Sequence, residues 1–182
     1  MTTAELRLFV ETEESDAILE TRLKSVEQAI RAYTNNNFQN RPFRAVAVAL
    51  ADGNKLIHNS NVPFEEGDTL EIGESEYQNG ELVTVAIVGE DGELTVNEKL
   101  YNESGVVITK VKYPDDVKSG VANLVKWDLE KRDKVGVASE SISRHSVTYF
   151  NMDGDNALMG YPKSLLGFLK PYKRARFGRG FY

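Results

Sequence analysis

The final stretch of the chain, residues 173–182, carries the residue types best suited to a specific interaction. Its cations and aromatic rings are Lys173, Arg174, Arg176, Phe177, Arg179, Phe181 and Tyr182. Cationic groups orient a segment toward carboxylates, and aromatic rings fill pockets. The segment has too few apolar residues to fold alone. We therefore predict that it becomes ordered by docking into an acidic or aromatic groove of a partner; a solvated chain end is the alternative.

Residues that could support catalysis or bind a metal are few and scattered. The absence of cysteine excludes thiolate chemistry and disulfides. The two histidines, His58 and His145, are far apart and have no partner at a metal-binding spacing. The polar stretch after residue 150 has Asn156 and Pro162 where a calcium loop requires glycine and glutamate. We expect a protein that is not an enzyme and has no cofactor and no metal.

Charge is unevenly distributed along the chain. The net charge is −6, yet residues 61–105 hold twelve acidic residues and a single basic one, Lys99. An acidic surface avoids binding the phosphates of DNA. The imbalance argues against a nucleic-acid-binding module, because such domains usually carry a basic face. A module of that kind, stacking the Arg/Gly/aromatic tail on bases, remains the alternative.

The sequence also bears on a membrane role. No apolar run approaches the roughly 20 residues that a membrane span needs. Residues 1–5 lack the basic and then apolar layout of a secretion signal. We expect no membrane partner.

The elements that must position the tail begin with an amphipathic helix over residues 15–34. Its apolar residues recur every three or four positions: Leu19, Leu23, Val26, Ile30 and Tyr33. This spacing places them on one helical stripe. Ser15 or Asp16 is suited to cap the start, and the asparagines at 35–37 are suited to end the helix. A short helix is also predicted over residues 3–10.

From Phe43 onward the period changes to that of strands. Val46, Val48 and Leu50 alternate with small or polar residues. Further strands are predicted over residues 69–72, 82–88, 93–97 and 106–111, with tight turns at Asn79-Gly80 and Asp91-Gly92. Short strands with frequent turns predict a small antiparallel barrel or sandwich.

Helical spacing returns after Pro114 and continues to about Arg132, with Trp127 flanking the apolar face. An alternating hairpin is predicted over 139–149, a polar loop over 151–160 and a short helix over 162–172. The fold class is therefore α+β: a small helical bundle with a C-terminal hairpin, carrying an inserted antiparallel barrel or sandwich. The predicted domains are a discontinuous helical core (1–41 and 114–172), an inserted β domain (42–113) and an extended tail (173–182).

Four stretches at the two ends of the chain resemble the head–tail connector (adaptor) proteins of long-tailed phages. They are AYTNNNF at 32–38, YPDDVK at 113–118, SESISRHSVTY at 139–149, and YPKSLL with LKPYKR within 161–174. The middle, FEEGDTLEI at 64–72 and NGELVTV at 79–85, resembles a small β module common in phage head and tail proteins. Many connectors are shorter and lack such an insertion.

The resemblance implies a structural virion protein that forms a ring, typically of twelve copies. The ring would be assembled in the host cytoplasm. In the virion it would sit at the head–tail interface, between the portal protein and a tail-side completion or stopper protein. Genomic DNA would pass through the ring without binding tightly. The tail would bind the portal. Trp127 is a candidate contact between ring subunits, with a place in the core of its own subunit as the alternative. Another phage tail ring protein that shares only the β module is a further alternative.

Overall fold

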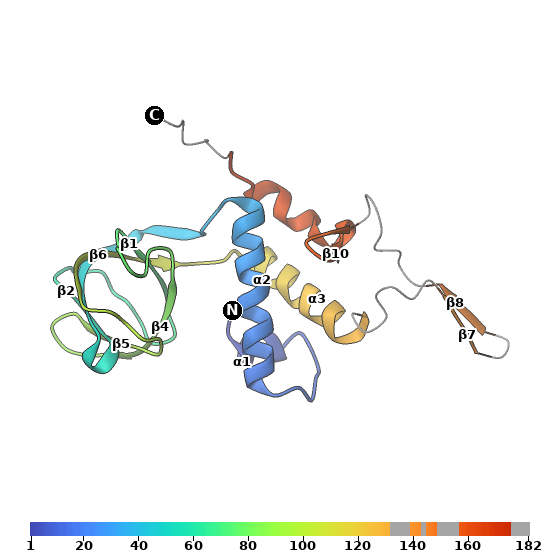
Figure 1. Ribbon diagram of the computed structural model, residues 1–182, viewed down its shortest axis with the longest axis horizontal. Coiled ribbons are helices and arrows are strands. Elements are labelled where there is room, and N and C mark those ends of the chain that lie inside the picture. Colours follow the sequence, from blue (N-terminus) through green and yellow to red (C-terminus); the bar gives the residue numbers. More distant parts are fainter. Residues whose placement is uncertain (132–138, 143–144, 149–156, 176–182) are drawn as a thin grey trace. The chain divides into compact units, whose positions relative to one another are not determined.

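The structure is a computed structural model that describes residues 1–131, 139–142, 145–148 and 157–175 (Figure 1). The chain divides into two compact units. One comprises residues 1–36 and 113–182, and the other is Asn37–Lys112. Helices dominate the first unit and antiparallel strands the second, which confirms the predicted α+β class. Within the described part of the chain, no helix has both the length and the apolar character needed to cross a membrane.

The helical unit is built from α1 (Thr3–Arg7), α2 (Asp16–Thr34), α3 (Asp115–Lys131) and the 3-10 helix η4 (Lys163–Tyr172). The predicted stripe of α2 is buried at Leu19, Leu23, Val26 and Ile30. Ser15 occupies the N-cap position, but its side chain makes no capping hydrogen bond, so the predicted side-chain cap is not observed there. Asn35 ends the helix in the left-handed conformation with a φ of 49°. Helix α2 packs against α3, and η4 contacts both.

Helix α3 begins directly after Pro114, as its sequence predicts. The Asp116 carboxylate accepts a 2.9 Å hydrogen bond from the Val117 amide, one of the groups that a helix start leaves without an internal partner. Further along α3, the tip of the Phe168 ring in η4 lies directly against Gly120. A side chain larger than hydrogen would separate the two elements at this point.

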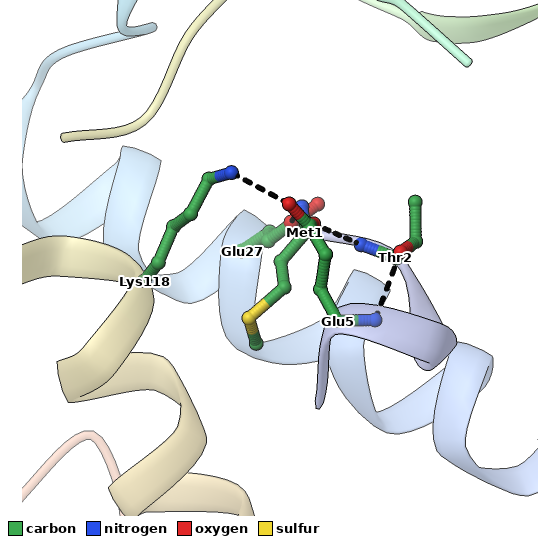
Figure 2. Close-up of polar contacts among 5 residues, drawn as sticks. All are labelled: Met1, Thr2, Glu5, Glu27 and Lys118. Carbon is green, nitrogen blue, oxygen red and sulfur yellow. Dashed lines mark hydrogen bonds and ion pairs between the residues drawn. The ribbon is translucent and has the colours of Figure 1, made fainter. Parts of the chain in front are cut away.

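A polar cluster joins the first three helices of this unit (Figure 2). Thr2 and Glu5 form a capping box at the start of α1. The Glu5 carboxylate also accepts a 2.8 Å hydrogen bond from the Lys118 ammonium on α3. The α-amino group of Met1 lies 2.9 Å from the Glu27 carboxylate on α2. The short helix α1 is thereby tied to both long helices.

Because this cluster includes the Glu5 carboxylate, we expect the stability of the helical unit to depend on pH. The Lys118 hydrogen bond holds the pKa of Glu5 below its usual value of 4.5. A depressed folded-state pKa means that the stabilisation is complete above pH 4.5 and is lost as the pH falls through the lower, folded-state pKa. Because the pair is partly exposed, we expect the loss to be only a few tenths of a kcal/mol.

The Glu5→Gln variant should therefore lose less thermal stability than the parent chain between pH 6 and pH 3. Comparing the change in Tm of the two proteins over this range measures the effect. Glu20→Gln is the matched control, since Glu20 forms an exposed helical pair with Lys24. Equal changes in Tm for the parent chain and Glu5→Gln would contradict the prediction.

The second unit is a closed, fully antiparallel barrel. Its strands are β1 (Gln39–Leu50), β2 (Lys55–His58), β3 (Thr69–Gly73), β4 (Leu82–Val88), β5 (Glu93–Val96) and β6 (Glu103–Val111), in the spatial order β1-β2-β5-β4-β3-β6, and the 3-10 turn η1 (Asp52–Asn54) joins β1 to β2. Gly105, with a φ of 80°, is the extra residue of a bulge between β1 and β6. Closure leaves this barrel without a free strand edge, so partners must meet its side chains.

Strand β1 turns its smaller apolar residues inward. Ala45, Ala47 and Ala49 are buried in the barrel, whereas Val46 is 63 % exposed and Val48 41 % exposed. The interior is filled by larger side chains from the other strands, including Leu56, Leu70, Val83, Leu94 and Ile108. A small barrel has a narrow interior, so large residues on some strands require small ones on others.

Two short hairpins complete the helical unit. Strands β7 (Ser139–Ile142) and β8 (His145–Thr148) pair antiparallel, which confirms the predicted C-terminal hairpin. Strands β9 (Ala157–Leu158) and β10 (Tyr161–Pro162) pair around Met159 and Gly160, whose φ values are 57° and 77°. A two-residue turn with both φ values positive joins strands tightly. The predicted polar loop is therefore wrong at Ala157–Leu158, which form a strand, and is a tight turn at residues 159 and 160. Residues 151–156 lie outside the described residues.

Candidate partner-binding site at the root of the tail

The segment that leads into the basic tail lies along the C-terminal end of α2. We call residues 172–175 the tail root. The Arg174 amide donates a 2.8 Å hydrogen bond to the Thr34 carbonyl. The side-chain amide of Asn35 donates to the Ala175 carbonyl at 3.0 Å, and that of Asn36 to the Tyr172 carbonyl at 3.2 Å. The tail root is therefore held at both ends and near its middle.

Two side chains of the tail root add further contacts. The Lys173 ammonium lies 3.8 Å from the centre of the Tyr33 ring, near the C-terminal end of α2, where the helix dipole favours a cation. The Tyr172 hydroxyl donates a 2.7 Å hydrogen bond to the Asp116 carboxylate at the start of α3. This bond raises the pKa of Tyr172. The tail root thus contacts both long helices.

Local sequence explains why the end of α2 accepts the tail root. Thr34 is fully buried and donates its hydroxyl to the Ile30 carbonyl, one turn back. Asn35 then takes the left-handed conformation that ends the helix. The backbone leaves the helix at this point, so the side-chain amides of Asn35 and Asn36 can bond the tail root.

The free energy gained from the contacts of the tail root with the helical unit is close to the free energy lost in ordering its backbone. The tail-root contacts contribute roughly 0.5–1.5 kcal/mol each. Ordering the backbone costs about 1–2 kcal/mol per residue. The tail root is therefore held by several contacts together, and the loss of one of them has a measurable effect.

Of the predicted tail residues, the structure describes two. Lys173 lies over Tyr33, and the side chain of Arg174 is exposed. The others, Arg176, Phe177, Arg179, Phe181 and Tyr182, lie outside the described residues. Their role in binding a partner stays a prediction.

Trp127 is half-buried and contacts a residue of its own chain. Its ring meets the Tyr161 ring edge-on, with the ring centres 5.6 Å apart. The Tyr161 hydroxyl donates a 2.7 Å hydrogen bond to the Asp128 carboxylate, which is buried on α3. A role for Trp127 between subunits stays a prediction.

A hollow that the sequence reasoning missed lies between the segment after α1 and the end of α3. It has a volume of about 500 Å³. Its lining combines the apolar side chains of Leu8, Phe9 and Leu129 with four charged ones, Arg7, Glu11, Lys126 and Glu130. Leu8 is 83 % exposed and Phe9 56 % exposed. The sequence feature that indicates this hollow is the run Leu8-Phe9-Val10, because a short helix cannot bury three consecutive apolar residues on one face.

The described residues hold no group of three or more His, Asp or Glu side chains placed to bind a metal ion. His58 is buried in the barrel, where its ring meets the Phe64 ring edge-on and its Nδ1 lies 3.0 Å from the Ser60 hydroxyl. Burial lowers the pKa of His58, which favours the neutral ring. These contacts indicate a packed core histidine.

Comparison with known proteins yields only weak likeness. No family model matches the chain, and no curated protein matches it. One similar solved structure is described as the neck of an empty GTA particle computed with C6 symmetry. The match has 14 % sequence identity and a TM-score of 0.36, and covers 99 % of this chain and 92 % of that chain. A score this low does not establish a shared fold.

Proposed function

We propose that this chain is a structural, non-enzymatic subunit of a phage particle, forming the ring that connects the portal vertex of the capsid to the tail. The tail root is the observation that carries the proposal. It delivers a cationic and aromatic segment from a defined point on a helical unit. Repeating that segment around a ring lets weak individual contacts add to stable attachment.

The ring requires a head-to-tail contact that closes on itself. The described helical unit has two features suited to such a contact: the hollow beside Leu8 and Phe9, and the half-buried Trp127. Exposed apolar side chains around a hollow are typical of an interface. The family resemblance suggests twelve copies, with the portal protein on one side and a completion or stopper protein on the other.

The acidic character of the chain supports a role as a DNA passage. Outside the tail, acidic residues outnumber basic ones, and we expect the acids that line the channel to come from the helical unit rather than from the barrel. A channel wall of this charge releases few counterions from DNA and so binds it weakly. The isolated ring is expected not to retain duplex DNA at physiological salt.

Removing residues 176–182 tests the proposal. We expect the truncated chain, which keeps the tail root, to lose at least about tenfold in affinity for the portal protein of the same phage, because multivalent attachment amplifies the loss of each arm. Sedimentation of the mixture measures the bound fraction. Replacing Arg176 and Arg179 by lysine is the matched control, as it retains the charge and the length. Undiminished portal binding by the truncated chain would sink the proposal.

A nucleic-acid-binding module is the second candidate, favoured by the arginine, glycine and aromatic residues of the tail. Titration of the full and truncated chains with single-stranded DNA at two salt concentrations separates the two functions. Tight binding that depends on the tail and falls steeply with salt would favour this candidate. We expect weak binding by both chains.

A further inference from the structure

We propose that the side-chain amides of Asn35 and Asn36 form a clamp that fixes where the tail departs, and that both are positioning residues for partner binding. The purpose of the clamp rests on the proposed function. The clamp itself is a property of this chain alone and is testable without a partner.

The two amides act on opposite ends of the same short segment. Asn36 holds the carbonyl of Tyr172, and Asn35 holds the carbonyl of Ala175. Between them the Arg174 amide bonds the last residue of α2, Thr34. A segment attached at one point can pivot about it, whereas one attached at both ends keeps its direction. Asn35, through Ala175, is the attachment nearest the point where the tail departs, so without it the tail could pivot about the Arg174 amide.

The choice of asparagine at position 35 supports this role. Its φ of 49° is a left-handed conformation, for which glycine is the usual residue at a helix end. Glycine would end α2 equally well but has no side chain to reach Ala175. Asn36 is only 6 % exposed, and its buried amide donates to Tyr172. Contacts with the tail root give a reason for an asparagine at both positions, whereas ending the helix gives a reason only for the asparagine at position 35.

The clamp limits how far the tail can reach. A fully extended chain spans at most about 3.3–3.6 Å per residue, so Tyr182 can lie no more than about 25 Å from Ala175. Release of the tail root would move the last fixed point back by four residues, from Ala175 to Pro171, and extend this limit to about 40 Å. The groove that receives the tail must therefore lie within about 25 Å of the end of α2. A longer free tail also lowers the local concentration of its binding groups.

Limited trypsin digestion of the full chain tests the clamp. Lys173 and Arg174 are cleavage sites inside the tail root, and Arg179 is a reference site beyond it. Mass spectrometry gives the initial cleavage rate at each. We expect Asn35→Gly, which keeps the backbone conformation, and Asn36→Ala each to raise the ratio of tail-root to Arg179 cleavage by about 3- to 10-fold, as local opening becomes more frequent.

Asn37→Ala is the matched control, because this third asparagine bonds Glu71 in the barrel instead of the tail root. Its ratio should equal that of the parent chain. Circular dichroism establishes whether each variant is folded. If Asn36→Ala does not fold, Asn35→Gly alone still tests the clamp. An unchanged ratio in Asn35→Gly would overturn the clamp.

Portal binding by the same variants then tests the purpose of the clamp. We expect Asn35→Gly to bind several-fold more weakly than Asn37→Ala. A raised cleavage ratio with unaltered portal affinity would overturn the positioning role while leaving the proposed function intact. By contrast, if the chain lacking 176–182 still bound the portal normally, the proposed function itself would fail.

Discussion

Replacing Gly92 by alanine is expected to destabilise the barrel by about 2–5 kcal/mol in all, mainly because the added methyl group meets backbone and not a side chain that could move aside. A Cβ at this position would lie 2.0 Å from the His58 carbonyl oxygen. The His58 amide donates a 3.0 Å hydrogen bond to the Gly92 carbonyl, so the two backbones are held together here. The φ of 78° adds a further cost for any residue with a Cβ.

The Gly80→Ala variant separates the steric cost from the conformational cost. Gly80 has a φ of 87° but no atom within 4 Å of its ideal Cβ position, so its replacement adds only the conformational cost of about 1–2 kcal/mol. Chemical denaturation followed by circular dichroism measures both variants. Equal losses for the two variants would contradict the prediction, because the steric cost at Gly92 would then be absent.

Replacing Gly120 by valine is expected to destabilise the helical unit by about 2–3 kcal/mol, as overpacking of a well-filled core usually does. A Cβ on Gly120 would lie 2.4 Å from the tip of the Phe168 ring. Helix η4, which carries Phe168, continues into the tail root. The variant should therefore also raise trypsin cleavage at Lys173 and Arg174.

Gly167→Ala is the matched control, since it lies beside Phe168 in η4 yet has nothing within 4 Å of its ideal Cβ. Fluorescence of Trp127, the single tryptophan, reports unfolding of the helical unit. A double-mutant cycle makes the test specific: Phe168→Leu combined with Gly120→Ala should lose less stability than the two single changes summed. Strictly additive losses would exclude steric contact between the two positions.

The helices were predictable because their signals are local. The apolar stripe of α2 and the asparagine at its end lie within about twenty consecutive residues, and both are observed. The start of α3 after Pro114 follows from proline and two acidic residues in one turn. The composition of residues 173–182 is a local signal of the same kind and favours a binding tail, although binding itself and the partner both stay predictions.

The clamp could not be predicted because its partners are far apart in sequence. Asn35 and Ala175 are 140 residues apart, and Asn36 and Tyr172 are 136 apart. Three consecutive asparagines predict a helix end, which requires only one of them. The other two asparagine side chains had no role in that prediction. The sequence does not indicate which carbonyl a side-chain amide will bond.

The sequence alone determined the helices, most of the barrel strands, the charge of the chain and the chemistry of its tail, since backbone geometry repeats over neighbouring residues. Strand β2 and the β9–β10 hairpin were not predicted. Only the tertiary structure decided that β1 turns its alanines inward and its valines outward, and that the tail root docks on α2. An alternating strand has the same period whichever face is buried. The choice depends on the volume supplied by distant strands, and the docking depends on carbonyls that folding brings to the end of α2.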